Sequence, residues 1–135
     1  MTTLDPGDFD SFGVAADLIV ALRRHGIDGD VIASLSAPPG RHRLHITARP
    51  SGHMVLSVRY DDLTLSRRNV LADALATRGW DTDEDQQGAT RRFPPGTEHT
   101  TVVFEVLEVL TLGGTPPDPR TVSVVDASGL PVALD

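Results

Sequence analysis

The sequence of 135 residues contains no cysteine and no lysine, and only six of its residues are aromatic. Without cysteine there is no disulfide bond, no thiol nucleophile and no sulfur ligand for a structural zinc site. No run of about 18 apolar residues occurs, so we expect no membrane-spanning helix. The first eight residues lack the basic and apolar segments of a secretory signal. We therefore expect a cytoplasmic protein without membrane contact.

The composition is that of one folded domain, residues 1–135. The net charge of −7 argues against nucleic-acid binding by the whole surface, and the few aromatic residues do not supply stacking platforms for single strands. All twelve basic residues are arginine; a coding bias explains this better than a functional preference, because the twelve positions are scattered. We expect no nucleic-acid partner.

Two segments have the apolar spacing of amphipathic helices. Residues 8–26 place apolar side chains at intervals of three and four, with Asp8, Asp10 or Ser11 as the cap and Gly26 as the end. A second helix is predicted from Ser66, as its cap, to Arg78, and Gly79 ends it. Its predicted buried residues are Val70, Leu71, Ala74 and Leu75.

Between Val31 and Tyr60 the apolar residues alternate with a period of two, which predicts three antiparallel strands. If the apolar side chains of the last two strands share one face, Ile46 must oppose Leu56. The loop is then residues 50–52, whose proline and glycine suit a three-residue hairpin turn.

The remaining segments are less regular. A short hairpin is predicted over residues 80–93. Its turn lies within residues 83–88, because Gly88 is the residue there that suits a left-handed turn position. Residues 98–112 are rich in valine, which favours a strand, but their spacing favours a helix with Thr101, Glu105, Glu108 and Thr111 on one polar stripe. We favour the helix and leave the strand open. A terminal hairpin is predicted from residues 121–125 and 130–134.

These elements predict an α+β fold in which helices pack on one face of an antiparallel sheet. The predicted order is α-β-β-β-α-β-β-α, followed by the C-terminal hairpin. No internal repeat is present.

Metal and cofactor sites are not supported by the sequence. His42 and His45 are three residues apart in a strand, so they point to opposite faces. Asp81, Asp83 and Asp85 begin like a calcium loop, but the glycine and closing glutamate of that motif are missing. Phosphate-binding loops, dinucleotide-binding glycine patterns and nucleophile elbows are absent. We expect no metal and no cofactor.

Two functions other than protein binding stay open. A small enzyme or ligand-binding protein would use a pocket between sheet and helices, with His99, Glu105 or Tyr60, if those groups converge. A regulatory or toxin-neutralising protein would use the acidic stretch Asp81 to Asp85. No motif for catalysis is present, so an enzyme is the less favoured reading.

The charges of residues 31–60 are one-sided, because four arginines and three histidines occur there without any acidic residue. In the predicted register, five basic side chains lie on the sheet face opposite the apolar one. Guanidinium groups on such a face suit carboxylate or phosphate groups of a partner, although they could equally pair with the chain's own acids. The predicted partner-binding residues are Arg43, His45, Arg49, His53 and Arg59.

The element order, the Gly79-Trp80 pair and the stretch Arg91 to Pro94 before the helix at Glu98 resemble the type III secretion chaperones and the YbjN-like proteins. The resemblance implies a non-enzymatic, chaperone-like adaptor that offers a sheet surface to extended segments of another protein. It also implies a homodimer, with the contact at Val102, Val106 and Val109. The additional hairpin after Pro119 departs from the family and puts the dimer geometry in doubt.

Overall fold

The computed structural model describes residues 2–85, 87–112 and 116–134. In chain order the elements are β1 (Thr2–Leu4), α1 (Ser11–His25), a 3-10 turn η1 (Gly26–Asp28), β2 (Val31–Leu35), β3 (Arg43–Ala48), β4 (Met54–Arg59), α2 (Leu65–Thr77), β5 (Asp81–Thr82), β6 (Gly88–Phe93), α3 (His99–Leu110) and β7 (Arg120–Asp126).

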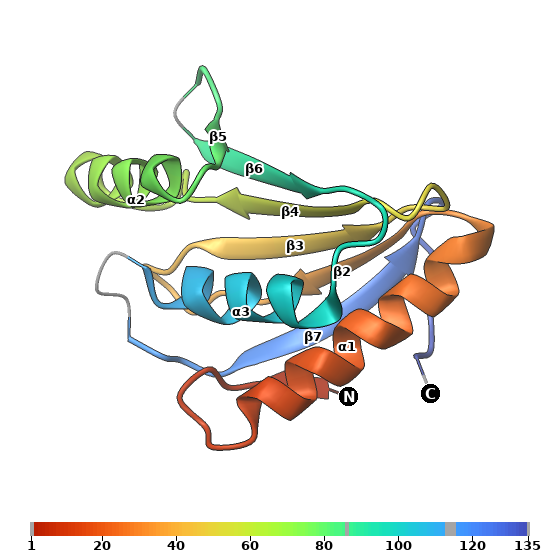
Figure 1. Cartoon of the computed structure of the whole chain (residues 1–135). Coiled ribbons are helices and arrows are strands. Elements are labelled where there is room, and N and C mark those ends of the chain that lie inside the picture. The colour runs from red at the N-terminus through yellow and green to blue at the C-terminus, as the bar shows by residue number, and fades with distance from the viewer. Residues whose placement is uncertain (1, 86, 113–115, 135) are drawn as a thin grey trace.

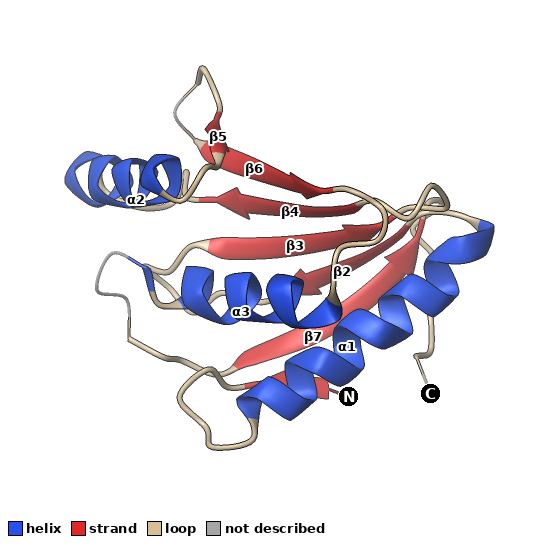
Figure 2. Cartoon of the chain, viewed as in Figure 1, coloured by secondary structure: helices blue, strands red, loops and turns tan. Residues whose placement is uncertain are grey.

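The strands of the described residues form one antiparallel sheet with the order β1-β7-β2-β3-β4-β6-β5. Helices α1 and α3 lie side by side across one face of this sheet, and α2 lies beyond the end of β4 (Figure 1). The predicted α+β class is therefore confirmed. Figure 2 shows the helices and the sheet as separate layers.

The hairpin of β3 and β4 has the predicted register, with Ile46 opposite Leu56. Gly52 has a φ of 93°, and its amide donates to the carbonyl of Arg49 at 2.9 Å, so the turn chemistry also matches the prediction. Every second residue of both strands is buried. The hairpin therefore has one face in the core and one face outside it.

Residues 98–112 are helical, so the choice of helix over strand is confirmed. The valine and leucine side chains of α3 pack against the sheet and against α1, because the wide apolar arc has to be buried on more than one side. The buried apolar residues of the two helices are Ala15, Leu18, Ile19, Leu22, Val102, Val103, Val106, Val109 and Leu110.

Helix α2 differs from the prediction in its cap and its buried face. Thr64 is the N-cap and its hydroxyl accepts from the amide of Arg67, whereas Ser66 lies inside the helix. Leu71 and Leu75 are buried as predicted, but Ala74 is only half-buried and Val70 is exposed. The helix lies at the edge of the fold, so a narrower apolar stripe is enough to hold it.

The predicted C-terminal hairpin is formed only in part. The chain turns back after β7, and residues 130–132 lie antiparallel to it through the bridge of Val125 with Pro131 and two backbone hydrogen bonds, but they do not form a strand; β7 itself pairs along its length with β2 and β1. Short-range patterns could not reveal this, because β7 and β2 are far apart in the sequence. Strand β1 was not predicted, since three residues show no periodicity.

Gly88 has a different role from the one predicted. It lies in β6 opposite Arg59, and its φ is not positive. A Cβ atom at this position would lie 2.8 Å from the carbonyl oxygen of Val58 and 3.0 Å from a carboxylate oxygen of Asp83. Glycine is needed here for close approach of the backbone, not for a left-handed turn.

Gly88→Ala should therefore lower the free energy of unfolding by about 1–3 kcal/mol, the usual cost of overpacking. Urea denaturation measures the change. Gly13→Ala is the matched control, because a Cβ at this exposed helical position meets nothing within 4 Å. The control should be neutral or slightly stabilising. Equal stability of the two variants would contradict the steric argument.

Candidate functional site

The outer face of the sheet is the side away from α1 and α3, and no described helix packs on it (Figure 1). Strand alternation places Arg43 and His45 of β3 and Arg59 of β4 on this face, each partly exposed between buried neighbours. Arg49 and His53 continue the alternation beyond the strand ends, and the amide of Arg49 donates to the carbonyl of His53 at 3.1 Å. All five predicted partner-binding residues therefore lie on one face.

A row of four hydroxyl side chains and one histidine, which we call the hydroxyl row, crosses the middle of the outer face. Consecutive pairings join the members of the row, which are Ser123, Ser34, His45, Ser57 and Thr90. The Ser34 hydroxyl lies 3.0 Å from Nδ1 of His45. Burial lowers the pKa of His45, and the charges of Arg43 and Arg59 lower it further. His45 is therefore neutral at pH 7, and it contributes hydrogen bonding and no positive charge.

The contact of Ser34 with His45 does not make a hydrolytic site. A nucleophile and base need a third group that orients the base and a concave site for the substrate. Within the described residues, no carboxylate is hydrogen-bonded to His45.

One end of the outer face is neutralised by the chain's own acids. Arg43 Nη2 lies 2.6 Å from Oδ1 of Asp61, and Arg59 Nη1 lies 3.1 Å from Oδ2 of Asp83. The hydrogen bond from Arg43 lowers the pKa of Asp61. The sequence could not reveal these pairs, because both acids lie outside the acid-free segment and reach it through the fold.

The opposite end of the outer face is more open. Arg92 of β6 is opposite Val55, which places it on the outer face near His53. In the part of the chain that the structure describes, neither Arg49 nor Arg92 forms an ion pair, and both are exposed. We call Arg49, His53 and Arg92 the open basic end. Sequence reasoning missed Arg92 because β6 had no predicted register.

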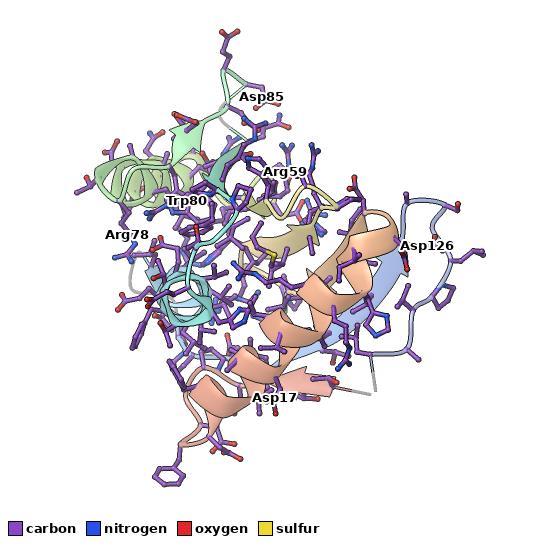
Figure 3. The ribbon with its side chains drawn as sticks, turned by 45° about the vertical axis from the view of Figure 1, so that its right-hand side comes forward. Asp17, Arg59, Arg78, Trp80, Asp85 and Asp126 are labelled. Atoms are coloured by element: carbon purple, nitrogen blue, oxygen red, sulfur yellow. The ribbon has the colours of Figure 1, made fainter. Side chains whose placement is uncertain are left out.

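Glu105 is buried in a cluster of donors between α3, β6 and the end of α2. Arg78 donates to both carboxylate oxygens, at 3.0 and 2.9 Å, and Trp80 Nε1 donates at 2.8 Å. Arg91 Nη1 lies 3.2 Å from Oε2. Arg78 and Trp80 lie close together on this side of the molecule (Figure 3).

The environment of Glu105 fits a structural ion cluster. Burial by itself raises the pKa of the carboxyl, but the hydrogen bonds from Arg78 and Trp80 and the charges of Arg78 and Arg91 outweigh it, so the pKa is lowered. A carboxylate with its oxygens occupied and its charge stabilised is poorly suited to exchanging a proton with a substrate.

The other two residues of the enzyme hypothesis lie elsewhere. His99 is exposed at the start of α3, and the Tyr60 hydroxyl donates to the carbonyl of Gly88 at 3.0 Å. Tyr60 lines a polar cavity of about 390 Å³ together with Arg68, but neither His99 nor Glu105 lines it. The convergence that this hypothesis requires is therefore not found among the described residues.

The residues predicted for the dimer contact are buried inside the single chain. Val102, Val106 and Val109 have exposed fractions of 0 %, because they pack in the core between α3 and the sheet. The prediction of a contact through these three side chains is corrected accordingly, since a second copy would meet only the outward residues of α3, such as Phe104.

A buried polar pair lies at the other end of α3. His42 Nε2 donates to the carbonyl of Val109 at 2.6 Å, and Arg120 Nη1 donates to the carbonyl of His42 at 2.8 Å. His42 points inward and His45 outward, as their spacing predicts. Burial lowers the pKa of His42 to about 4; the bond to Val109 opposes this shift, and the charges of Arg120 and Arg41 add to it.

The described residues contain no group of three histidine, aspartate or glutamate side chains arranged to hold a metal ion. None of the helices in this part of the chain has the length and apolarity needed to cross a bilayer. No protein-family model, curated protein or solved structure matches the sequence or the fold.

Proposed function

We propose that this chain is a protein-binding, chaperone-like adaptor without catalytic activity, and that its outer sheet face takes an acidic segment of another protein. The main observation that supports this proposal is the open basic end. Its exposed guanidinium groups, Arg49 and Arg92, have no internal carboxylate partner among the described residues. Guanidinium forks on a surface bind carboxylates in pairs of parallel hydrogen bonds.

The adjoining hydroxyl row extends the polar surface across the sheet. Serine and threonine side chains both donate and accept, so they suit the backbone and side chains of an extended segment. Arg43 and Arg59 contribute less than the sequence suggested, because a partner carboxylate would have to compete with Asp61 and Asp83. The resemblance to type III secretion chaperones supports the same mode of binding.

Reversal of the charges at the open basic end tests the proposal. Arg49→Glu/Arg92→Glu should weaken binding of a fluorescently labelled, glutamate-rich peptide at least about tenfold, because two attractive contacts become repulsive. Fluorescence polarisation at low and high salt measures the affinity. The affinity of the unmodified protein should fall as salt rises.

The matched control is Arg24→Glu/Arg67→Glu, which makes the same change of net charge at exposed helical positions. It should retain nearly full affinity. Equal weakening by both double variants would show that only the overall charge matters. If the unmodified protein does not bind the glutamate-rich peptide, the proposal that the outer face takes an acidic segment is contradicted.

A further inference from the structure

Three of the four phenylalanines of this chain are at the surface. Phe9 has an exposed fraction of 102 %, Phe12 of 39 % and Phe104 of 58 %, whereas Phe93 is buried. The chain has few aromatic residues, so their placement outside the core is unusual for a domain of this size. Exposed aromatic side chains that lie close together are typical of protein interfaces.

Two of these rings are already packed on each other. The ring centroids of Phe12, at the start of α1, and Phe104, in the middle of α3, are 5.3 Å apart with an interplanar angle of 54°. The two helices lie side by side on one face of the sheet (Figure 1), and both rings are exposed. The pair is thus a preformed apolar surface on the side of the molecule opposite the outer sheet face.

Acidic residues are close to these phenylalanines in the sequence. Asp8 and Asp10 flank Phe9 directly, and all three are exposed. The carboxylate of Asp10 makes no capping bond to α1, although Asp10 is its N-cap. Glu108 lies one helical turn after Phe104; its side chain has an exposed fraction of 57 %, and its Oε2 is 3.8 Å from Nη1 of Arg78, so it is only loosely paired. The arginines of α1 are in its last turn, at the far end of the helix.

We define the acidic aromatic patch as Phe9, Phe12 and Phe104 with Asp8, Asp10 and Glu108. We propose that this patch docks a segment of a partner protein that presents apolar side chains flanked by lysine or arginine. The apolar side chains cover the phenylalanines, and the basic ones pair with the surrounding carboxylates.

Charge favours such a partner over a second copy of the same chain. A symmetric dimer through this patch brings each acid near its own equivalent or near another acid of the patch. The chain as a whole also has a net charge of −7. Like charges brought together at an interface oppose association. The inference does not rest on the proposed function, because it uses a different face and the opposite charge.

A model peptide provides the probe for this patch. It is a labelled 18-residue helical peptide with leucines at intervals of three and four and with lysine and arginine between them. Fluorescence polarisation should show binding to the full chain. A second peptide, with glutamine in place of the basic residues, should bind much more weakly, because it lacks the charges that pair with the carboxylates.

Phe9→Ser/Phe104→Ser should weaken binding of the basic peptide at least about tenfold, the loss typical of central aromatic contacts. Leu65→Ser/Val70→Ser replaces two exposed apolar residues of α2 and should leave the affinity unchanged. Asp8→Asn/Asp10→Asn should weaken binding and reduce its dependence on salt. If the double variant does not fold, the single variant Phe9→Ser is tested instead. Phe9 is fully exposed and contributes nothing to the core, so its replacement should not affect folding.

Several results would overturn the proposal. One is unchanged affinity of the phenylalanine variants, and another is equal binding of the two peptides. A third is a dimer in analytical ultracentrifugation that Phe9→Ser dissociates, since the occupant would then be a second copy. Arg49→Glu/Arg92→Glu should not alter binding of the basic peptide, so failure here is distinguishable from failure of the outer-face proposal.

Discussion

Glu105→Ala is expected to lower the free energy of unfolding by about 2–4 kcal/mol. The substitution leaves the guanidinium groups of Arg78 and Arg91 side by side without their shared carboxylate, and it removes the acceptor of Trp80. The two arginines are partly exposed and regain some hydration, which keeps the loss below that of a fully buried pair. Urea denaturation measures the change.

The control for this prediction is Glu108→Ala. Glu108 is exposed and lies 3.8 Å from Arg78, so its removal should cost less than about 1 kcal/mol. The effect of Glu105 should also depend on pH. Its pKa is lowered by folding, so its stabilisation is present above the unfolded value of about 4.3 and is lost as pH falls through the folded pKa. Equal losses of unfolding free energy in Glu105→Ala and Glu108→Ala would show that the cluster around Glu105 does not stabilise the fold.

Acidification from pH 6.5 to pH 4 is expected to remove about 3 kcal/mol of stability through His42 alone. The folded pKa of His42 is about 4, because burial and the charges of Arg120 and Arg41 disfavour its protonated form. The unfolded chain takes up the proton near pH 6.5, and the folded chain does not. Stability therefore falls as pH falls through this window, and the contribution of this group levels off below the folded pKa.

His42→Gln tests this assignment. Glutamine can donate to the carbonyl of Val109 but does not titrate, so the stability of the variant should vary less between pH 6.5 and 4. Denaturation curves at four or five pH values give the slopes. His53→Gln is the control, because His53 lies at the hairpin turn outside the core and its Nδ1 is hydrogen-bonded to the hydroxyl of Ser51. The assignment fails if His42→Gln retains the slope of the unmodified protein.

The hairpin of β3 and β4 was predictable because two independent signals agree. The alternation of apolar residues gives the inward face, and the turn of Pro50, Ser51 and Gly52 accepts only the register with Ile46 opposite Leu56. The basic outer face follows from the same register. Helices α1 and α3 were predictable from spacing, since their apolar stripes are long.

The partners of charged side chains were not predictable. Asp61 and Asp83 reach Arg43 and Arg59 only after strands and helices have been placed. Glu105 was assigned to a polar stripe by its spacing, but the fold brings three donors to it and buries it. Long-range pairings set these contacts, and local periodicity does not contain them.

The position of β7 also bears on how the chain reaches its folded state. This last strand lies between β1 and β2, near the beginning of the chain, and pairs Ala33 with Val124. While β7 is still inside the ribosome, a nascent chain can form the β3–β4 hairpin. Strand β1 then has no partner, because it pairs with β7. Completion of the sheet must therefore wait until β7 has emerged, and we expect slow folding that is limited by this late insertion.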